Sequence, residues 1–381
     1  MVRKYMFSVS DSFLKHFANL DDPRIKNDHN KRHSLTDILI LTILAVICGA
    51  ESWVDVEQFG DLKEDWLKTF LELSNGIPSH DTIGKLFARL SPEVLQNSFL
   101  SWIHSLVEIT DGEIVAIDGK TLRHSYDKAL NRKAIHMVSA WACNNQLILG
   151  QLKVNEKSNE ITAIPELLKM IDMKGCTVTI DAMGTQKEIA SQIVQQEGNY
   201  VLALKGNQGI PHMVVENYFQ TALENGFDGI PYDYFEETNK GHGRIEVRKY
   251  WTISNLEWLY DRNLWDGLRS VGMVRSTRII DKKETTETRY FLMSFENNAK
   301  RFGLSVRSHW EIEALHWCLD VSFNEDDCRV RKGNAAENFS TIRRIALNLL
   351  KNETSRKVGI KTKRKKCGWS NQYLLKVLST K

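Results

Sequence analysis

Apolar side chains recur at helical spacing over residues 1–105. Ser34 and Ser91 stand just before two of these runs, where a side-chain oxygen caps the start of a helix. The longest apolar run, residues 38–50, is shorter than the roughly 20 residues that span a bilayer, so it predicts a buried helix and no membrane segment. We therefore expect a helical N-terminal domain over residues 1–105, with DNA binding as one possible role.

The spacing changes to short apolar runs typical of strands from residue 113 onward. We expect strands over 114–117, 136–143, 147–154, 176–184 and 199–205, with helices over 160–173 and 187–196. An antiparallel meander followed by two α/β crossovers is the layout of the ribonuclease-H-like fold. The sequence thus predicts an α/β protein with a mixed sheet, whose first part covers residues 106–209.

The remaining residues divide into three parts. Alternating segments joined by charged turns predict a β-rich inserted subdomain over residues 210–299. The last helices of the core are expected over 300–350, and a basic C-terminal tail over 351–381. Within that tail the stretch RKVGIKTKRKK, residues 356–366, fits either DNA contact or a solvated disordered end.

Two predicted strands end on aspartate. Asp118 follows the apolar run 114–117, and Asp181 follows a similar run three strands later. Asp118 precedes Gly119, so a hairpin turn is the alternative reading there. In the expected topology the first and fourth strands are neighbours, which would bring the two carboxylates together. Such a pair repels unless it is protonated or bridged by a cation, and Mg²⁺ prefers carboxylate oxygens.

A helix is expected over residues 307–323 with an unusual polar ridge. Three or four titratable groups lie on one side of it, flanked by two aromatic side chains, a composition more natural beside a cleft than in open solvent. The ridge consists of His309, Glu313, His316 and Asp320, and the aromatic residues are Trp310 and Trp317.

A third acid for the cation site is expected on this ridge. Glu311 lies about 160° around the helix from Glu313, so the two cannot face one cleft. Asp320 shares the ridge but lies roughly 10 Å along it, by the helical rise. We therefore predict that Glu313 joins Asp118 and Asp181, with Asp320 farther out.

Basic side chains offer two candidate DNA contacts outside the tail. Lys85 and Arg89 lie on the open side of a predicted amphipathic helix, which fits a helix in a DNA groove or an ordinary surface helix. Arg244 and Arg248 share one face of a strand with Glu246 between them, which fits phosphate contact or cross-strand pairing.

Composition and motif spacing exclude several classes of protein, but they do not indicate a binding partner. The net charge is only +3, from 51 basic and 48 acidic residues, so the total charge does not indicate nucleic acid. Six cysteines without a CxxC pair argue against structural zinc and a secreted disulfide framework, and favour reduced thiols in the cytoplasm. The stretch Gly119-Lys120-Thr121 is not a phosphate loop, because Ile114 stands where that motif needs glycine.

The chain resembles the DDE-type insertion-sequence transposases, specifically the H-repeat-associated group. The resemblance runs nearly from end to end, and its most specific motifs surround the three predicted acids. These motifs are IDGK at Asp118, TIDAMG at Asp181 and HWEIEALHWCLD at Glu313, together with DPR at 22–24, HSLTDILILTILAVICGAESW at 33–53 and FG at 59–60. The resemblance implies that the three acids are catalytic and hold two Mg²⁺ or Mn²⁺ ions, and that residues 210–299 form the family's β-rich insertion.

The resemblance also implies partners and a reaction. These are metal-dependent cleavage and strand transfer on double-stranded DNA, at inverted-repeat ends and target, by a nucleoid-associated homodimer. His309 and Lys120 are further candidate DNA contacts. Many relatives carry Tyr, Arg, Glu and Lys where this chain has Val306, His309, Glu313 and Asp320. That departure keeps open a decayed or domesticated DNA-binding relative, and a metal-dependent nuclease of other purpose is the third hypothesis.

Overall fold

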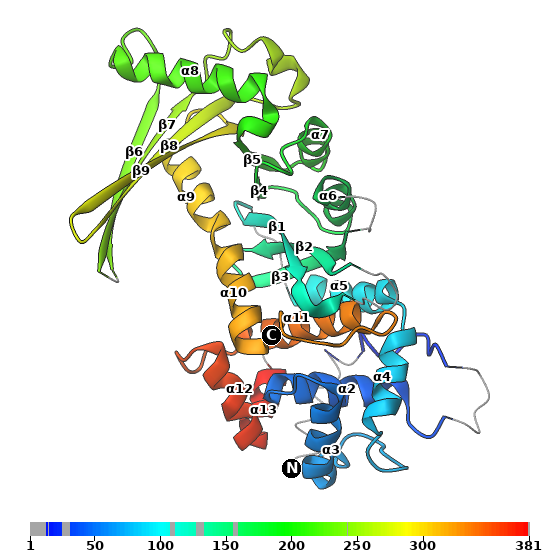
Figure 1. Cartoon of the computed structure of the whole chain (residues 1–381). Helices are drawn as coiled ribbons and strands as arrows, with labels where there is room; N and C mark the ends of the chain where they lie inside the picture. The colour runs from blue at the N-terminus through cyan, green and yellow to red at the C-terminus, as the bar shows by residue number, and fades with distance from the viewer. Residues whose placement is uncertain are drawn as a thin grey trace.

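The N-terminal part of the chain is helical. The computed structural model describes residues 13, 15–24, 31–106, 111–126, 133–154, 159–241 and 243–379. Its first helices are α2 (Leu35–Cys48), α3 (Trp53–Leu67), α4 (His80–Arg89) and α5 (Pro92–Leu106). They pack beside α11 (Ala335–Asn352), so the two ends of the chain share one helical layer at the base of the molecule (Figure 1).

Helix α2 is the buried helix that the apolar run predicts. The Ser34 side chain accepts a hydrogen bond from the Asp37 N–H at 3.0 Å, and Gly49, at φ 121°, ends the helix. Almost every side chain between these caps is buried against α3, α11 and α12. Among the described residues no single helix is long and apolar enough to cross a membrane. By length and composition only, α2 and α3 pass that test together, as a pair bent by 95°.

The strands of the described residues form one nine-stranded mixed sheet, in the order β3-β2-β1-β4-β5-β9-β8-β7-β6. Strands β1 to β3 form the expected antiparallel meander, and β4 and β5 run parallel to β1. Helices α6 (Glu160–Lys169) and α7 (Lys187–Gln195) make the crossovers. The predicted ribonuclease-H-like fold is therefore confirmed. The strands are β1 (Ile114–Leu122), β2 (Ile135–Ala142), β3 (Leu147–Lys153), β4 (Thr177–Ile180), β5 (Asn199–Leu204), β6 (Asp233–Gly241), β7 (Arg244–Ile253), β8 (Ser270–Ile280) and β9 (Lys283–Met293).

The region 210–299 extends this sheet instead of forming a separate one. Strand β9 pairs antiparallel with β5, from Val201 opposite Met293 to Leu204 opposite Tyr290. Strands β8, β7 and β6 follow outward, and helix α8 (Ile210–Glu224) lies across them (Figure 1). Pairing with β9 satisfies the backbone groups that β5 would otherwise leave at an open edge. The outer strands are consequently fixed relative to β1 and β4.

The helix predicted over 307–323 is in fact two helices. Helix α9 (Ala299–His309) contacts the outer strands as well as β1 and β4, and α10 (Glu311–Phe323) contacts β1 and α12. Trp310 stands between them, and its N–H reaches back to the Arg307 and Ser308 carbonyls. The periodicity continues through this interruption, which is why the sequence reads as one helix.

The basic tail is folded, so the disordered alternative is wrong. It forms α12 (Ile360–Trp369) and α13 (Asn371–Leu378). Inside α12 the Lys363 ammonium donates to the Leu350 carbonyl at 2.9 Å, and the Arg364 guanidinium donates to the Val46 carbonyl at 2.8 Å. Both side chains are buried. These two charges therefore serve the fold, since they satisfy carbonyls at the ends of α11 and α2.

Replacing Arg364 tests this internal role. We expect Arg364→Met to lower the free energy of unfolding by about 1–3 kcal/mol, because the Val46 and Ser322 carbonyls lose a charged donor inside the protein. Urea unfolding followed by circular dichroism measures the change. Lys365→Met, on the exposed side of the same helix, is the matched control and should leave the midpoint nearly unchanged. Equal midpoints for the two variants would contradict the assignment.

Candidate active site

Asp118 and Asp181 lie side by side on two central strands, Asp118 in the middle of β1 and Asp181 directly after β4. Strands β1 and β4 pair in parallel register, with Ile117 opposite Ile180, so the next residue on each strand is an aspartate. Both the predicted strand end and the alternative hairpin turn at Asp118 are wrong, because β1 continues beyond this residue and pairs Gly119 with Val138 of β2. The juxtaposition that the sequence predicts thus follows directly from this register.

One cavity of about 190 Å³ is lined by Asp118, Asp181 and Glu313 together. Asp320 is not among its lining residues, and Glu311 is directed elsewhere, where it accepts a hydrogen bond from the Gln146 amide at 2.7 Å. Glu313 is therefore the acid of α10 that faces Asp118 and Asp181. Other residues lining the cavity include Thr179, Lys205, Arg289, Val306, His309 and Trp310.

The cavity is electrostatically unfavourable for a carboxylate. Burial raises the pKa of Asp118 to about 7, and the negative charges of Glu160, Asp181 and Glu313 add to the shift. Asp181 is better supported, because its carboxylate accepts the N–H groups of Met183 at 3.1 Å and Gly184 at 3.3 Å. A cation bound between the acids would remove the repulsion.

The donor set fits a hard divalent cation, since three carboxylates share the cavity. As placed in the described residues, however, no three His, Cys, Asp or Glu side chains are gathered closely enough to hold an ion. Binding would therefore have to draw the carboxylates of Asp118, Asp181 and Glu313 inward.

Two histidines adjoin the acids and are neutral at pH 7. Burial lowers the pKa of His309 to about 4, and its Nδ1 lies 2.9 Å from the Thr179 hydroxyl. Burial likewise lowers the pKa of His316 to about 4, with its Nδ1 3.6 Å from the Asp118 carboxylate. His309 was predicted as a DNA contact. A buried neutral imidazole cannot serve as a cationic phosphate ligand, so any contact it makes is a neutral hydrogen bond.

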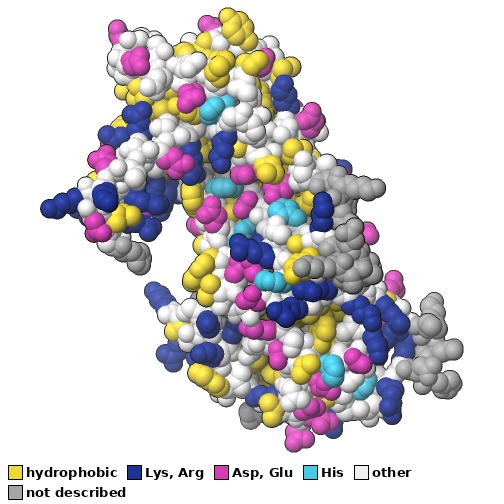
Figure 2. Space-filling model, in the orientation of Figure 1, with side chains coloured by type: hydrophobic (Ala, Val, Ile, Leu, Met, Phe, Trp, Pro, Cys, Tyr) yellow, Lys and Arg dark blue, Asp and Glu magenta, His cyan; other side chains and the backbone are white. Residues whose placement is uncertain are grey.

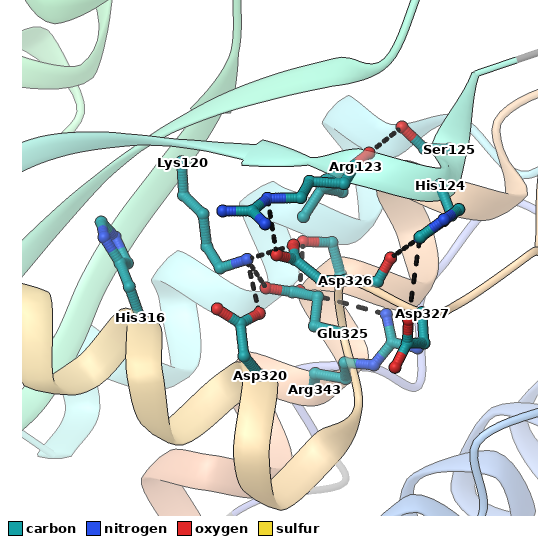
Figure 3. A network of polar contacts seen from close by, with 12 residues as sticks. Lys120, Arg123, His124, Ser125, His316, Asp320, Glu325, Asp326, Asp327 and Arg343 are labelled. Carbon is teal, nitrogen blue, oxygen red and sulfur yellow. Dashed lines mark hydrogen bonds and ion pairs between the residues drawn. The ribbon is translucent and has the colours of Figure 1, made fainter.

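The Lys120 side chain is buried inside the protein. Its ammonium lies 2.7 Å from both the Asp320 and Asp326 carboxylates and 3.8 Å from Glu325, and its side chain is only 7% exposed (Figure 3). This pairing leaves no ammonium for the DNA contact that the sequence suggests. This ion pair also explains the position of Asp320, the competing third acid. Asp320 neutralises Lys120 and does not line the cavity.

The acidic residues that follow α10 form further ion pairs with arginine side chains. Although burial opposes it, Arg344 and Arg343 hold the pKa of Glu325 at about 2. The Arg123 guanidinium lies 3.2 Å from Asp326 (Figure 3). Strand β1, which carries Asp118, is thereby tied to the end of α10, which carries Glu313.

Sequence reasoning missed four residues near the acids. Lys205 follows β5 at the same sheet edge as the two aspartates, so its place after a strand was a usable signal. Nothing local marks Arg289, which comes from β9. Glu160 and His136 pair at 2.6 Å in the space where a side chain on residue 119 would lie, which explains the glycine there.

A second cavity adjoins the first and is rich in arginine. It shares Arg289, Val306 and Trp310 with the acidic cavity. Lys and Arg side chains gather over the outer strands of the sheet, which line this cavity (Figure 2). Its charged lining residues are Arg244, Arg248, Arg278, Arg289 and Arg307, against Glu246 and Glu287. We call this the arginine trough.

Glu246 organises the trough. It lies 2.9 Å from the Arg244 guanidinium and 3.2 Å from that of Arg278, and it also contacts Arg248. The cross-strand pairing offered by the sequence is therefore present. Because the arginines outnumber the carboxylates, the trough keeps a net positive charge.

Comparison with known proteins identifies the class. A family model described as "Transposase DDE domain" matches residues 109–349, and one described as "DDE_Tnp_1-associated" matches residues 14–103. The chain belongs to the DDE-domain transposase family.

Its relatives place it within that family. It is 44% identical over 372 residues to the "H repeat-associated putative transposase YhhI" of Escherichia coli K12, covering 96% of this chain and 97% of that protein. It is 43% identical to the "Putative transposase YncI" of E. coli O157:H7, over 94% and 92% of the two chains. The resemblance stated from the sequence is confirmed. A piggyBac transposase synaptic complex with hairpin DNA aligns at a TM-score of 0.41 and 11% identity, over 97% of this chain and 77% of that one.

The pKa of Asp118 leads to a pH-dependent stability difference. Its folded pKa of about 7 exceeds the usual 3.8, so wild-type stability falls as pH rises between these values. In EDTA, Asp118→Asn should match the wild type near pH 4 and exceed it by roughly 4 kcal/mol at pH 8, since the pKa difference of about 3 converts at about 1.4 kcal/mol per unit. Thermal unfolding of both proteins across this range measures the difference. If the stabilities of the two proteins changed in parallel with pH, the raised pKa of Asp118 would be contradicted.

Lys120 should be essential for stability. Lys120→Met leaves three carboxylates without their shared cation, and we expect a loss of about 2–4 kcal/mol in urea unfolding. Adding Asp320→Asn should restore part of it, by roughly 1 kcal/mol, because one uncompensated charge disappears. Lys153→Met on β3, whose ion pair is long at 3.9 Å and partly exposed, is the control. No rescue by Asp320→Asn would argue against the network.

Proposed function

We propose that this protein is a DNA transposase that cleaves and joins DNA at the ends of its own insertion element, using Asp118, Asp181 and Glu313. The observation that carries the proposal is the shared cavity: adjacent strands β1 and β4 bring two aspartates together, and α10 adds a glutamate. Membership of the DDE-domain transposase family supports the same reaction class.

The three acids would hold divalent ions, Mg²⁺ or Mn²⁺, and two ions suit this chemistry best. When bound, such ions activate a water or a 3′ hydroxyl and stabilise the leaving oxygen of an in-line displacement. Lys205 and Arg289 line the same cavity as cations, in position to neutralise the oxygens of the reacting phosphate. His309, held through Nδ1 by Thr179 and neutral, can offer a hydrogen bond without adding charge.

DNA would approach along the arginine trough, because the trough adjoins the acidic cavity and shares Arg289 and Trp310 with it. Phosphate contacts of this kind position a duplex without reading its sequence. The trough is part of the central sheet, so a strand bound there has a fixed relation to the acids. Pairing of two DNA ends would require two copies of the chain, and we expect a homodimer on DNA.

Substitution of each acid tests the proposal. Asp118→Asn, Asp181→Asn and Glu313→Gln should each reduce nicking of end-containing DNA by at least about 100-fold with Mg²⁺ or Mn²⁺, because each removes an ion ligand. DNA binding in a gel-shift assay should persist. Glu311→Gln is the matched control on the same helix and should retain cleavage.

Two outcomes would count against the proposal. Retained cleavage in any of the three acid variants would remove that residue from the active site. A wild-type protein that shifts DNA but never nicks it with either ion would instead favour the decayed, DNA-binding relative.

A further inference from the structure

A third hollow, of about 600 Å³, lies between the N-terminal helices and the segment that joins α10 to α11. One wall is the start of α3 and the exposed side of α4, and the other is the loop 329–333, with sequence RVRKG. The lining residues of interest are Lys85, Arg329, Arg331 and Lys332, with Glu51 and Asp81. We call this hollow the α4 groove.

The loop is fixed against α4. Gly333, at φ +54°, sits so close to the Ala88 carbonyl that a side chain there would collide with it. The N–H of Asn334 donates to the same carbonyl at 3.1 Å, and the Asn338 amide donates to the Phe87 carbonyl at 2.8 Å. The two walls therefore keep their spacing without a ligand, which lowers the entropic cost of binding one.

The groove carries more positive than negative charge. Arg329 and Lys332 are exposed, and within the described part of the chain neither has a carboxylate within 4 Å. Lys85 is 3.5 Å from Asp81, but both side chains are well exposed, so the pair is easily exchanged for another anion. Arg331 is held in place by the His124 carbonyl at 2.8 Å and by the ring of Tyr126.

The groove and the arginine trough flank the acids from different directions. The trough lies on the outer strands β7 to β9, whereas α4 lies at the opposite end of the molecule, and β1 and β4 lie between them (Figure 1). The loop 329–333 follows Asp326, whose ion pair with Lys120 ties it to the strand of Asp118. A long duplex could therefore be held on both sides of the cavity.

We propose that the α4 groove binds the sugar–phosphate backbone of duplex DNA, as a second contact beyond the arginine trough. This inference rests on the proposed function, in that DNA is the substrate. The bound molecule is a polyanion, because Arg329 and Lys332 are flexible unpaired cations on a loop that is fixed against α4. Backbone contact is favoured over base reading, since Gly333 and Asn338 pack against the Ala88 and Phe87 carbonyls at the last turn of α4 and leave less of this helix free to enter a DNA groove.

The test is the salt dependence of binding by the full chain to a duplex of about 40 base pairs and arbitrary sequence, followed by fluorescence anisotropy. Each phosphate contact contributes about 0.9 to the slope of log affinity against log salt. The double variant Arg329→Ala/Lys332→Ala should lower that slope by about 2 and weaken binding roughly 10-fold at low salt. Arg329→Lys/Lys332→Arg keeps both charges and should keep the wild-type slope.

The matched control is Lys169→Ala/Lys174→Ala, which removes two exposed lysines far from the groove. If the groove variant and this control have the same slope, the groove does not bind DNA. A lower slope with an unchanged melting temperature supports it. The proposed function fails separately: wild-type protein that binds the duplex but never cleaves end-containing DNA overturns the transposase activity, while the slope difference still decides the groove.

Discussion

The parallel pairing of β1 with β4 is the constraint on which the candidate site depends. Because Ile117 and Ile180 share a register position, Asp118 and Asp181 must be neighbours, and their charges repel inside a partly buried cavity. Such a pair of buried like charges is costly unless a proton or a counter-ion compensates it. The rest of the structure can be understood as the means of holding this pair and bringing a third acid to it.

Some of the acidic side chains on and after α10 are neutralised by ion pairs, whereas another faces the cavity. Asp320, Glu325 and Asp326 surround Lys120, and Arg344 lies 2.6 Å from Glu325. Removing these charges from the cavity leaves Glu313 as the α10 acid that faces it. The same contacts tie α10 to β1 and carry the connection onward to the loop 329–333, so the candidate site and the α4 groove share one anchor.

The continuous sheet gives the outer strands a role beyond that of an appended domain. Pairing of β9 with β5 places Arg289 in the lining of the acidic cavity and the other arginines in the adjoining trough. A separate subdomain on flexible linkers could move relative to the acids. Here the hydrogen-bonded ladder fixes the distance between the basic surface and the acidic cavity, which is the preorganisation that electrostatic catalysis requires.

The sequence by itself determined the features that depend on local pattern: the strand that ends before Asp181, the crossover order, the buried helix after Ser34 and the preference for Glu313 over Glu311. It placed Asp118 on a strand, but not that this strand continues to Leu122. Tertiary structure alone decided the rest. The interruption at Trp310 leaves the apolar periodicity intact, so nothing in the pattern marks it. Lys120 pairs with Asp326, 206 residues away, and Arg364 with Val46, 318 residues away. Local spacing carries no information about such pairs, because a basic side chain reads the same whether it meets solvent, DNA or a buried carbonyl.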